Sequence, residues 1–167
     1  VLEKLDGQMI VGVMVGDTVQ CWSRKGHTQV GAMAERVMEE STGNYQALIA
    51  ASVARGRTPV FELIGKQSRI KTDEGPESDL VLIAERHHIS GNYSNHSSLW
   101  ELGQQHGVRV VKRFRELEQL SITEVVDTVR GWEGREGVVV RFNCGAMVKA
   151  KSEWWLKTGF CRADREA

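Results

Sequence analysis

The sequence lacks the features that would tie the protein to a membrane or to a disulfide scaffold. No apolar run approaches the roughly 20 residues that a membrane-spanning helix needs, and there is no signal-peptide pattern. The three cysteines, Cys21, Cys144 and Cys161, lie far apart and form no Cys-x-x-Cys pair. Neither a zinc site nor a disulfide framework is therefore indicated. These absences favour a reducing, intracellular setting, in the cytoplasm or alternatively the nucleus, with no membrane partner.

An excess of charge of either sign is also missing, because 22 basic and 22 acidic residues balance. This balance argues against a wholly basic protein that coats nucleic acid. It leaves room for a local basic groove, since phosphate binding needs only a patch. The 167 residues are 41% hydrophobic and 26% charged and show no internal repeat. This composition is typical of one soluble globular domain with a sizeable core.

The hydrophobic pattern predicts a mixture of strands and helices. Alternating or continuous apolar runs favour strands over residues 9–15, 18–22, 60–64, 80–84, 108–114, 136–142 and 147–151. Apolar residues at helical spacing favour helices over residues 30–41, 45–54 and 97–105 and from Ser121 onward. Ser121 and Glu124 form a capping box at the start of the last helix. We therefore expect an α+β fold.

The motif Lys4-Leu5-Asp6-Gly7 stands just before the first predicted strand. Gly7 permits a tight turn, and Asp6 brings a carboxylate near the lysine amine. An ordinary lysine has a pKa near ~10.4 and is a poor nucleophile, although desolvation or cationic neighbours can activate such an amine. On this motif alone, Lys4 is either a nucleophile or a solvated lysine at the end of a strand.

The last two predicted strands carry a second group of charged residues. Glu136 opens the first of them, and Lys149 and Lys151 lie two residues apart on the other, so both lysines share one face. Two neighbouring lysines repel each other unless an anion lies between them. A nucleotide phosphate is one such anion, and a solvated edge strand protected by lysines is the alternative.

Three further features are candidates for function. Glu62 lies between Phe61 and Leu63 on a strand, so its carboxylate faces either solvent or a pocket. Lys25 belongs to a basic loop that follows the second strand. Basic residues mark the predicted strand over 108–114, where they are weaker candidates for contacts with RNA phosphates: Arg109, Lys112 and Arg113.

Taken in order, these pieces resemble the covalent nucleotidyltransferase superfamily of polynucleotide ligases and RNA capping enzymes. The motifs are Lys4-x-Asp6-Gly7, Lys25-Gly26, Phe61-Glu62-Leu63, Glu136-Gly137 and Lys149-x-Lys151. The chain is most similar to ATP-dependent RNA ligases of the phage RNA-repair type. Three features carry this closer likeness: Phe61-Glu62-Leu63 followed by Ser68-Arg69-Ile70, Lys149-Ala150-Lys151-Ser152-Glu153-Trp154-Trp155, and Lys25-Gly26 at the family's usual distance after the nucleophile. The proline that usually lies within the first stretch is missing.

The resemblance implies a fold and a reaction. The fold is a nucleotidyltransferase (ATP-grasp-like ligase adenylation) domain over residues 1–167, in which antiparallel sheets form a nucleotide cleft with helices outside. We expect it to lack an N-terminal segment and any C-terminal domain of larger ligases. Lys4 would attack the α-phosphate of ATP and form lysyl-AMP, and AMP would pass to an RNA 5′-phosphate. A 3′-hydroxyl would then seal the RNA and release AMP, as in RNA repair or tRNA processing.

The resemblance also assigns roles to residues. The catalytic residues would be Lys4, Lys149 and Lys151, and Glu136 would bind Mg²⁺ or Mn²⁺. The nucleotide would be contacted by Glu3, Lys4, Asp6, Gly7, Lys25, Phe61, Glu62, Glu136, Lys149 and Lys151. The partners would be RNA 5′-phosphate and 3′-hydroxyl ends, and the protein a monomer. Alternatives are a DNA ligase, a capping guanylyltransferase, or a non-catalytic nucleic-acid-binding domain of the same fold. We expect the lysines and glutamates to converge within about 15 Å, the reach of one nucleotide.

Overall fold

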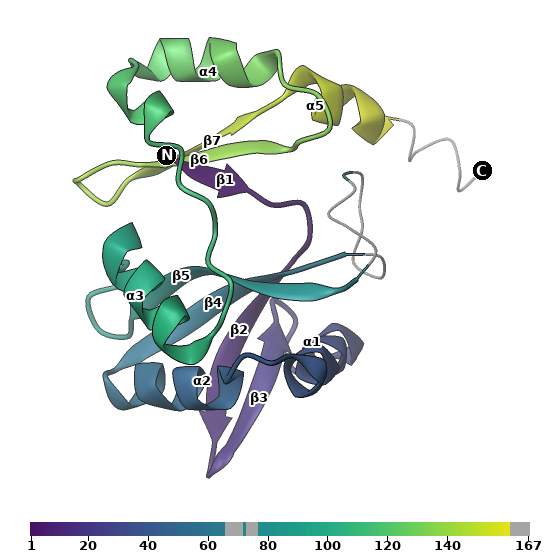
Figure 1. The fold of residues 1–167 in the computed structure, drawn as a ribbon, viewed down its shortest axis with the longest axis vertical. Coiled ribbons are helices and arrows are strands. Elements are labelled where there is room, and N and C mark those ends of the chain that lie inside the picture. The colour runs from purple at the N-terminus through teal and green to yellow at the C-terminus, as the bar shows by residue number, and fades with distance from the viewer. Residues whose placement is uncertain (66–71, 73–76, 161–167) are drawn as a thin grey trace.

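The computed structural model describes residues 1–65, 72 and 77–160. They form two lobes, each built on an antiparallel sheet (Figure 1). The large lobe has the strand order β3-β2-β4-β5, and the small lobe has the order β1-β6-β7. The predicted α+β class with antiparallel sheets and outer helices is confirmed. The predicted motif Ser68-Arg69-Ile70 lies outside the described residues.

The large lobe contains the elements from β2 to α3. Its strands are β2 (Gln8–Val15), β3 (Thr18–Ser23), β4 (Arg57–Ile64) and β5 (Asp79–His87). Its helices are α1 (Gln29–Glu40), α2 (Tyr45–Ala54) and α3 (His96–His106). They pack against the sheet around a core of fully buried side chains that includes Ile10, Ile49, Phe61 and Leu82. Each such side chain contributes roughly 1.5–3 kcal/mol by leaving water.

The small lobe consists of β1 (Leu2–Lys4), β6 (Gly137–Arg141) and β7 (Met147–Lys151) with α4 (Ile122–Arg130) and α5 (Glu153–Phe160). A short 3₁₀ helix, η1 (Glu116–Gln119), precedes α4. The capping box predicted at Ser121 and Glu124 is present at the start of α4. Val125 and Val129 of α4 lie in a second core with residues of β6 and β7. This helix therefore covers one face of the small sheet and leaves the other face toward the large lobe.

The predicted strand over 108–114 is wrong as a regular strand. The segment instead crosses between the lobes and makes an isolated bridge to each sheet, Val110 to Leu82 of β5 and Arg113 to Leu2 of β1. Its backbone hydrogen bonds are divided in the same way, since Leu82 donates to Arg109 and Glu3 donates to Lys112. The apolar residues correctly indicated a segment that pairs with neighbouring strands. They could not show that its two ends pair with different sheets. We call residues 108–114 the crossover segment.

In the part of the chain that the structure describes, no helix combines the length and apolar character needed to cross a membrane.

Candidate active site

Two of the predicted catalytic lysines lie in one row across the small sheet. Lys4 of β1 is opposite Gly137 of β6, and Gly137 is opposite Lys151 of β7. Residues opposite one another in a sheet share a face, so Lys4 and Lys151 flank a position that has no side chain. A Cβ atom at Gly137 would lie 2.0 Å from the carbonyl oxygen of Ala150, and the residue has φ of 151°. Both the space and the backbone conformation therefore require glycine there.

Glu136 lies immediately before this row and joins the two lysines. Its Oε1 atom is 2.7 Å from Nζ of Lys4 and 3.2 Å from Nζ of Lys151. The glutamate side chain is only 3% exposed, whereas the lysine side chains are 19% and 31% exposed. A buried carboxylate is stable only when it is paired. The three side chains thus form one charged cluster, which we call the lysine cluster.

The sequence predicted a carboxylate near Lys4 from Asp6, and in the structure the Glu136 carboxylate pairs with Lys4 at 2.7 Å. Asp6 is buried and accepts hydrogen bonds from the backbone N–H of Thr72 at 3.0 Å and its hydroxyl at 3.5 Å. Gly7 lies against β4, where a Cβ atom would be 2.3 Å from the carbonyl oxygen of Leu63. Gly7 is absent from the residues with positive φ, so it is required for space rather than for a left-handed conformation.

Glu62 faces the lysine cluster from the large lobe. Burial raises the pKa of Glu62 to about 7; Lys4 opposes this rise, and the negative charges of Glu136 and Asp6 add to it. The backbone N–H of Gly7, which is hydrogen-bonded to the carboxylate, also lowers the pKa. A carboxylate with this value exchanges its proton near neutral pH. The site therefore combines charged groups from both lobes, as the sequence predicted for Lys4, Glu62, Glu136 and Lys151.

The other predicted residues are placed less uniformly. Lys149 is exposed on β7 opposite Val139, one row away from Lys151 on the same face. Lys25 is exposed in the turn after β3, at the end of the large sheet where β2 begins. Glu3 pairs with Val138 and alternates with Lys4 along β1. Phe61 is fully buried and its ring packs against Tyr45, so its side chain supports Glu62 from the core and does not line the site.

Two residues that sequence reasoning did not assign hold the cluster in place. Ser152 is fully buried. Its hydroxyl donates to the backbone carbonyl of Arg135 at 2.6 Å and accepts from the backbone N–H of Trp155 at 3.1 Å. The ring of Trp155 lies 3.7 Å from Nζ of Lys151, a cation–π contact. The signal for both was the stretch Lys151-Ser152-Glu153-Trp154-Trp155, which the sequence linked to a motif.

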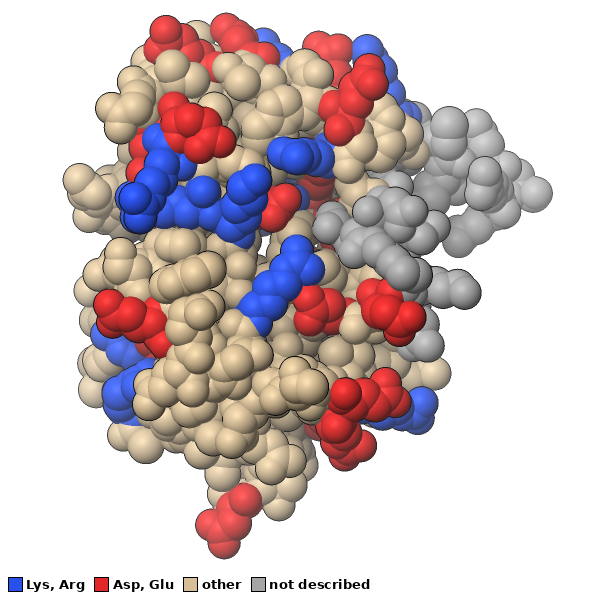
Figure 2. Space-filling model, in the orientation of Figure 1, with Lys and Arg blue, Asp and Glu red and all other residues tan. Residues whose placement is uncertain are grey.

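The three residues predicted to contact RNA lie on the crossover segment. Arg109 pairs with Asp79 at 3.1 Å, and Arg113 makes two hydrogen bonds of 2.8 Å to Glu118. Nζ of Lys112 lies 5.0 Å from the ring of Phe114. Figure 2 shows Lys and Arg side chains gathered between the lobes, over the upper part of this segment. Two of the three cations are thus already partly neutralised by carboxylates.

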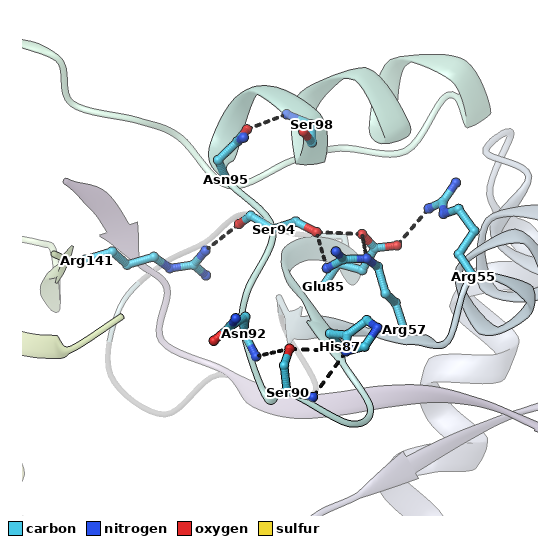
Figure 3. A network of polar contacts seen from close by, with 10 residues as sticks. All are labelled: Arg55, Arg57, Glu85, His87, Ser90, Asn92, Ser94, Asn95, Ser98 and Arg141. Carbon is cyan, nitrogen blue, oxygen red and sulfur yellow. Dashed lines mark hydrogen bonds and ion pairs between the residues drawn. The ribbon is translucent and has the colours of Figure 1, made fainter. Parts of the chain in front are cut away.

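A buried polar network lies in the large lobe away from the lysine cluster (Figure 3). Glu85 of β5 is 5% exposed and bonds to Arg55 at 2.8 Å and to the hydroxyl of Ser94 at 2.7 Å. Burial alone would raise the pKa of Glu85, but the hydrogen bonds, that from Ser94 foremost, outweigh it and lower the pKa. Arg57 also donates to the Ser94 hydroxyl, at 3.0 Å. The network fixes the loop between β5 and α3.

The comparison with known families identifies the chain. A family model described as RNA ligase matches residues 1–161. This chain belongs to the RNA ligase family. The predicted resemblance to RNA ligases is confirmed by that match, which covers nearly the whole chain. A search of curated proteins gave no significant match.

Solved structures with a fold similar to that of this RNA ligase family member include several of an RNA ligase from Naegleria gruberi. Its RNA ligase with PPi has a TM-score of 0.73 and 18% sequence identity, over 96% of this chain and 51% of that one. A mutant of that ligase with ATP and Mn gives a TM-score of 0.72 and 18% identity, over 94% and 49%. A further mutant without ligand gives 0.74 and 17%, over 96% and 51%. The family member described here therefore spans about half the length of these ligases.

Proposed function

We propose that this chain is the adenylation domain of an ATP-dependent RNA ligase, and that the space between its lobes is the nucleotide cleft. The carrying observation is the lysine cluster, in which Lys4 and Lys151 flank Gly137 and share the Glu136 carboxylate. A nucleotide α-phosphate would occupy the space over Gly137 between the two ammonium groups. Those groups would stabilise the charge that builds up on the phosphoryl oxygens during attack.

In the proposed reaction, Nζ of Lys4 attacks the α-phosphorus of ATP. A nitrogen–phosphorus bond forms, the bond to the β-phosphate oxygen breaks, and pyrophosphate leaves. The RNA 5′-phosphate then takes AMP from Lys4, and an RNA 3′-hydroxyl displaces AMP and seals the strand. Glu62, on the facing lobe, would accept hydrogen bonds from the ribose hydroxyls. Lys149 and Lys25 are further candidates for phosphate contacts, with Arg109, Lys112 and Arg113 as candidates for RNA contacts.

A divalent cation would depend on Glu136. Among the residues that the structure describes, no three His, Cys, Asp or Glu side chains cluster as a metal-binding group. A single carboxylate is nevertheless enough for Mg²⁺ or Mn²⁺, because in nucleotide enzymes the metal is bound by one or two carboxylates together with phosphate oxygens of the nucleotide. Glu136 would hold the metal, which when bound would neutralise charge on the phosphate oxygens.

The test is covalent labelling of the protein with α-labelled ATP and Mn²⁺ or Mg²⁺, followed by denaturation. We expect label on the wild-type chain, none on Lys4→Arg, and undiminished label on Lys157→Met, whose side chain is 77% exposed on α5. Lys4→Arg keeps the positive charge, so its failure would reflect loss of the nucleophile. Equal labelling of wild type and Lys4→Arg would contradict the proposal. Transfer of the label to RNA with a 5′-phosphate would then test the second step. That the chain acts as a monomer stays a prediction.

A further inference from the structure

Arg141 connects the two lobes at the end of the small sheet remote from the lysine cluster. It is the last residue of β6 and lies on the same face as Gly137, because the two are four residues apart on one strand. Its guanidinium donates to the carbonyl oxygen of Ile83 at 2.9 Å and to that of Ser94 at 3.4 Å. Both acceptors belong to the large lobe. Figure 3 shows the side chain extending toward Ser94.

The large-lobe side of this connection is rigid. Ser94 is held by the buried Glu85 through its hydroxyl, at 2.7 Å, and through its backbone N–H, at 2.9 Å. Arg55 pairs with the Glu85 carboxylate at 2.8 Å, and Arg57 donates to the Ser94 hydroxyl at 3.0 Å. The ring of Tyr93 lies 5.3 Å from the centre of the Arg141 guanidinium. Arg141 therefore ends on a part of the large lobe that is itself fixed by charge-assisted hydrogen bonds.

Packing between the lobes is incomplete at this point, although Leu2 of β1 is buried in the core of the large lobe. A cavity of about 690 Å³ separates them there, lined by Tyr93, Ser94 and His96 from the large lobe and by Arg141, Phe142 and Met147 from the small lobe. Across such a space, dispersion contacts are lost. Burial lowers the pKa of Arg141, yet a guanidinium stays charged at any ordinary pH. The Arg141 side chain therefore keeps its positive charge and spans the two lobes through its hydrogen bonds to two carbonyl oxygens.

The proposed active site is divided between the same two lobes. Lys4, Glu136 and Lys151 belong to the small lobe, whereas Glu62 belongs to the large lobe. We infer that Arg141 is a positioning residue, which holds the two lobes at the separation at which Glu62 faces Lys4. This role in catalysis rests on the proposed function. The separation itself does not, and it can be measured without ATP.

The first experiment measures the distance between the lobes. Spin labels would be attached at Glu39→Cys on α1 and Thr128→Cys on α4, both exposed positions, after Cys144→Ser and Cys161→Ser. Arg141→Met keeps the apolar stem and removes both hydrogen bonds, so we expect a longer and broader distance distribution. Arg141→Lys keeps the charge and should give an intermediate distribution. The matched control is Arg130→Met, since Arg130 is 59% exposed on α4. An Arg141→Met distribution equal to that of wild type would overturn the inference.

The second experiment follows the formation of lysyl-AMP. Displacement of the lobes by about 1 Å would weaken the reaction about 10- to 100-fold, mainly as a raised KM for ATP because the nucleotide must bridge both lobes. Arg141→Lys should recover part of this loss. Arg141→Met should reduce lysyl-AMP formation much less in a Glu62→Gln background than in wild type, because the Glu62 contact that Arg141 positions is already lost. Fully additive losses would contradict the positioning role. If the wild-type protein formed no lysyl-AMP, the proposed function alone would be refuted. The distance measurement would still test whether Arg141 sets the separation of the lobes.

Discussion

Lys4 and Lys151 belong to the two outer strands of the small sheet, yet their ammonium groups contact the same oxygen of Glu136, at 2.7 and 3.2 Å. Gly137 separates them and adds no side chain. Two like charges this close are tolerated because the buried carboxylate lies beside both. An incoming phosphate would meet a pair of cations whose positions are already set.

Replacing Glu136 with Gln should affect both stability and reaction. The substitution keeps the shape of the side chain but leaves Lys4 and Lys151 without their shared partner. Because the lysines are partly exposed, we expect a loss of about 1–3 kcal/mol in the free energy of unfolding, less than for a fully buried pair. Lysyl-AMP formation should fall at least about 100-fold, as for loss of a transition-state contact. Urea unfolding and ATP labelling measure the two effects; a variant as active as wild type would exclude a metal or charge role for Glu136.

The two lysines of β7 should differ in what they contribute to stability. Lys151 pairs with Glu136 and lies over the ring of Trp155, so Lys151→Met should cost about 1–2 kcal/mol. Lys149 is exposed, and Lys149→Met should stay within about 0.5 kcal/mol of wild type. Both variants should form less lysyl-AMP. Thermal unfolding and ATP labelling of the two variants would separate these effects, and equal destabilisation would argue against the contacts described for Lys151.

The pKa of Glu62 predicts how stability depends on pH. Burial raises this pKa from 4.5 to about 7, so between these values the folded state binds the proton more tightly than the unfolded state. Protonated Glu62 therefore contributes to the free energy of unfolding. This contribution is complete below about pH 4.5 and is lost as the pH rises through about 7. Relative to wild type, Glu62→Gln should therefore gain up to about 2–3 kcal/mol between pH 5 and pH 8. Urea unfolding at both pH values measures this gain; parallel pH profiles for the two proteins would show that the pKa is not raised.

Gly137 should be far less replaceable than Gly145, although both have positive φ. A Cβ atom at Gly137 would collide with the backbone of β7, whereas one at Gly145 meets nothing within 4 Å. Gly145→Ala should cost about 1 kcal/mol from backbone strain alone. Gly137→Ala should cost about 3 kcal/mol or more, because β6 and β7 must separate. The difference between the two melting temperatures isolates the collision, and similar values would mean that the small sheet adjusts freely.

The sequence was most informative where an interaction is local or where a motif is complete. The capping box at Ser121, the helix over 45–54 and the shared face of Lys149 and Lys151 follow from spacing along the chain, since hydrogen bonds and side-chain direction repeat with fixed periods. The order of the charged motifs also indicated which distant residues would meet. Glu62, Glu136, Lys4 and Lys151 were all found this way.

The tertiary structure decided which partner each of these groups has. Glu136 lies far from Lys4 in the sequence, and the register of β1 against β6 brings its carboxylate within 2.7 Å of the lysine. The Asp6 carboxylate, close to Lys4 in the sequence, accepts a hydrogen bond from Thr72. The same applies to the crossover segment, whose ends pair with different sheets, and to Arg141, whose carbonyl partners lie in the other lobe. Such contacts depend on how the two sheets are placed relative to each other, and the spacing of residues along the chain does not determine that placement.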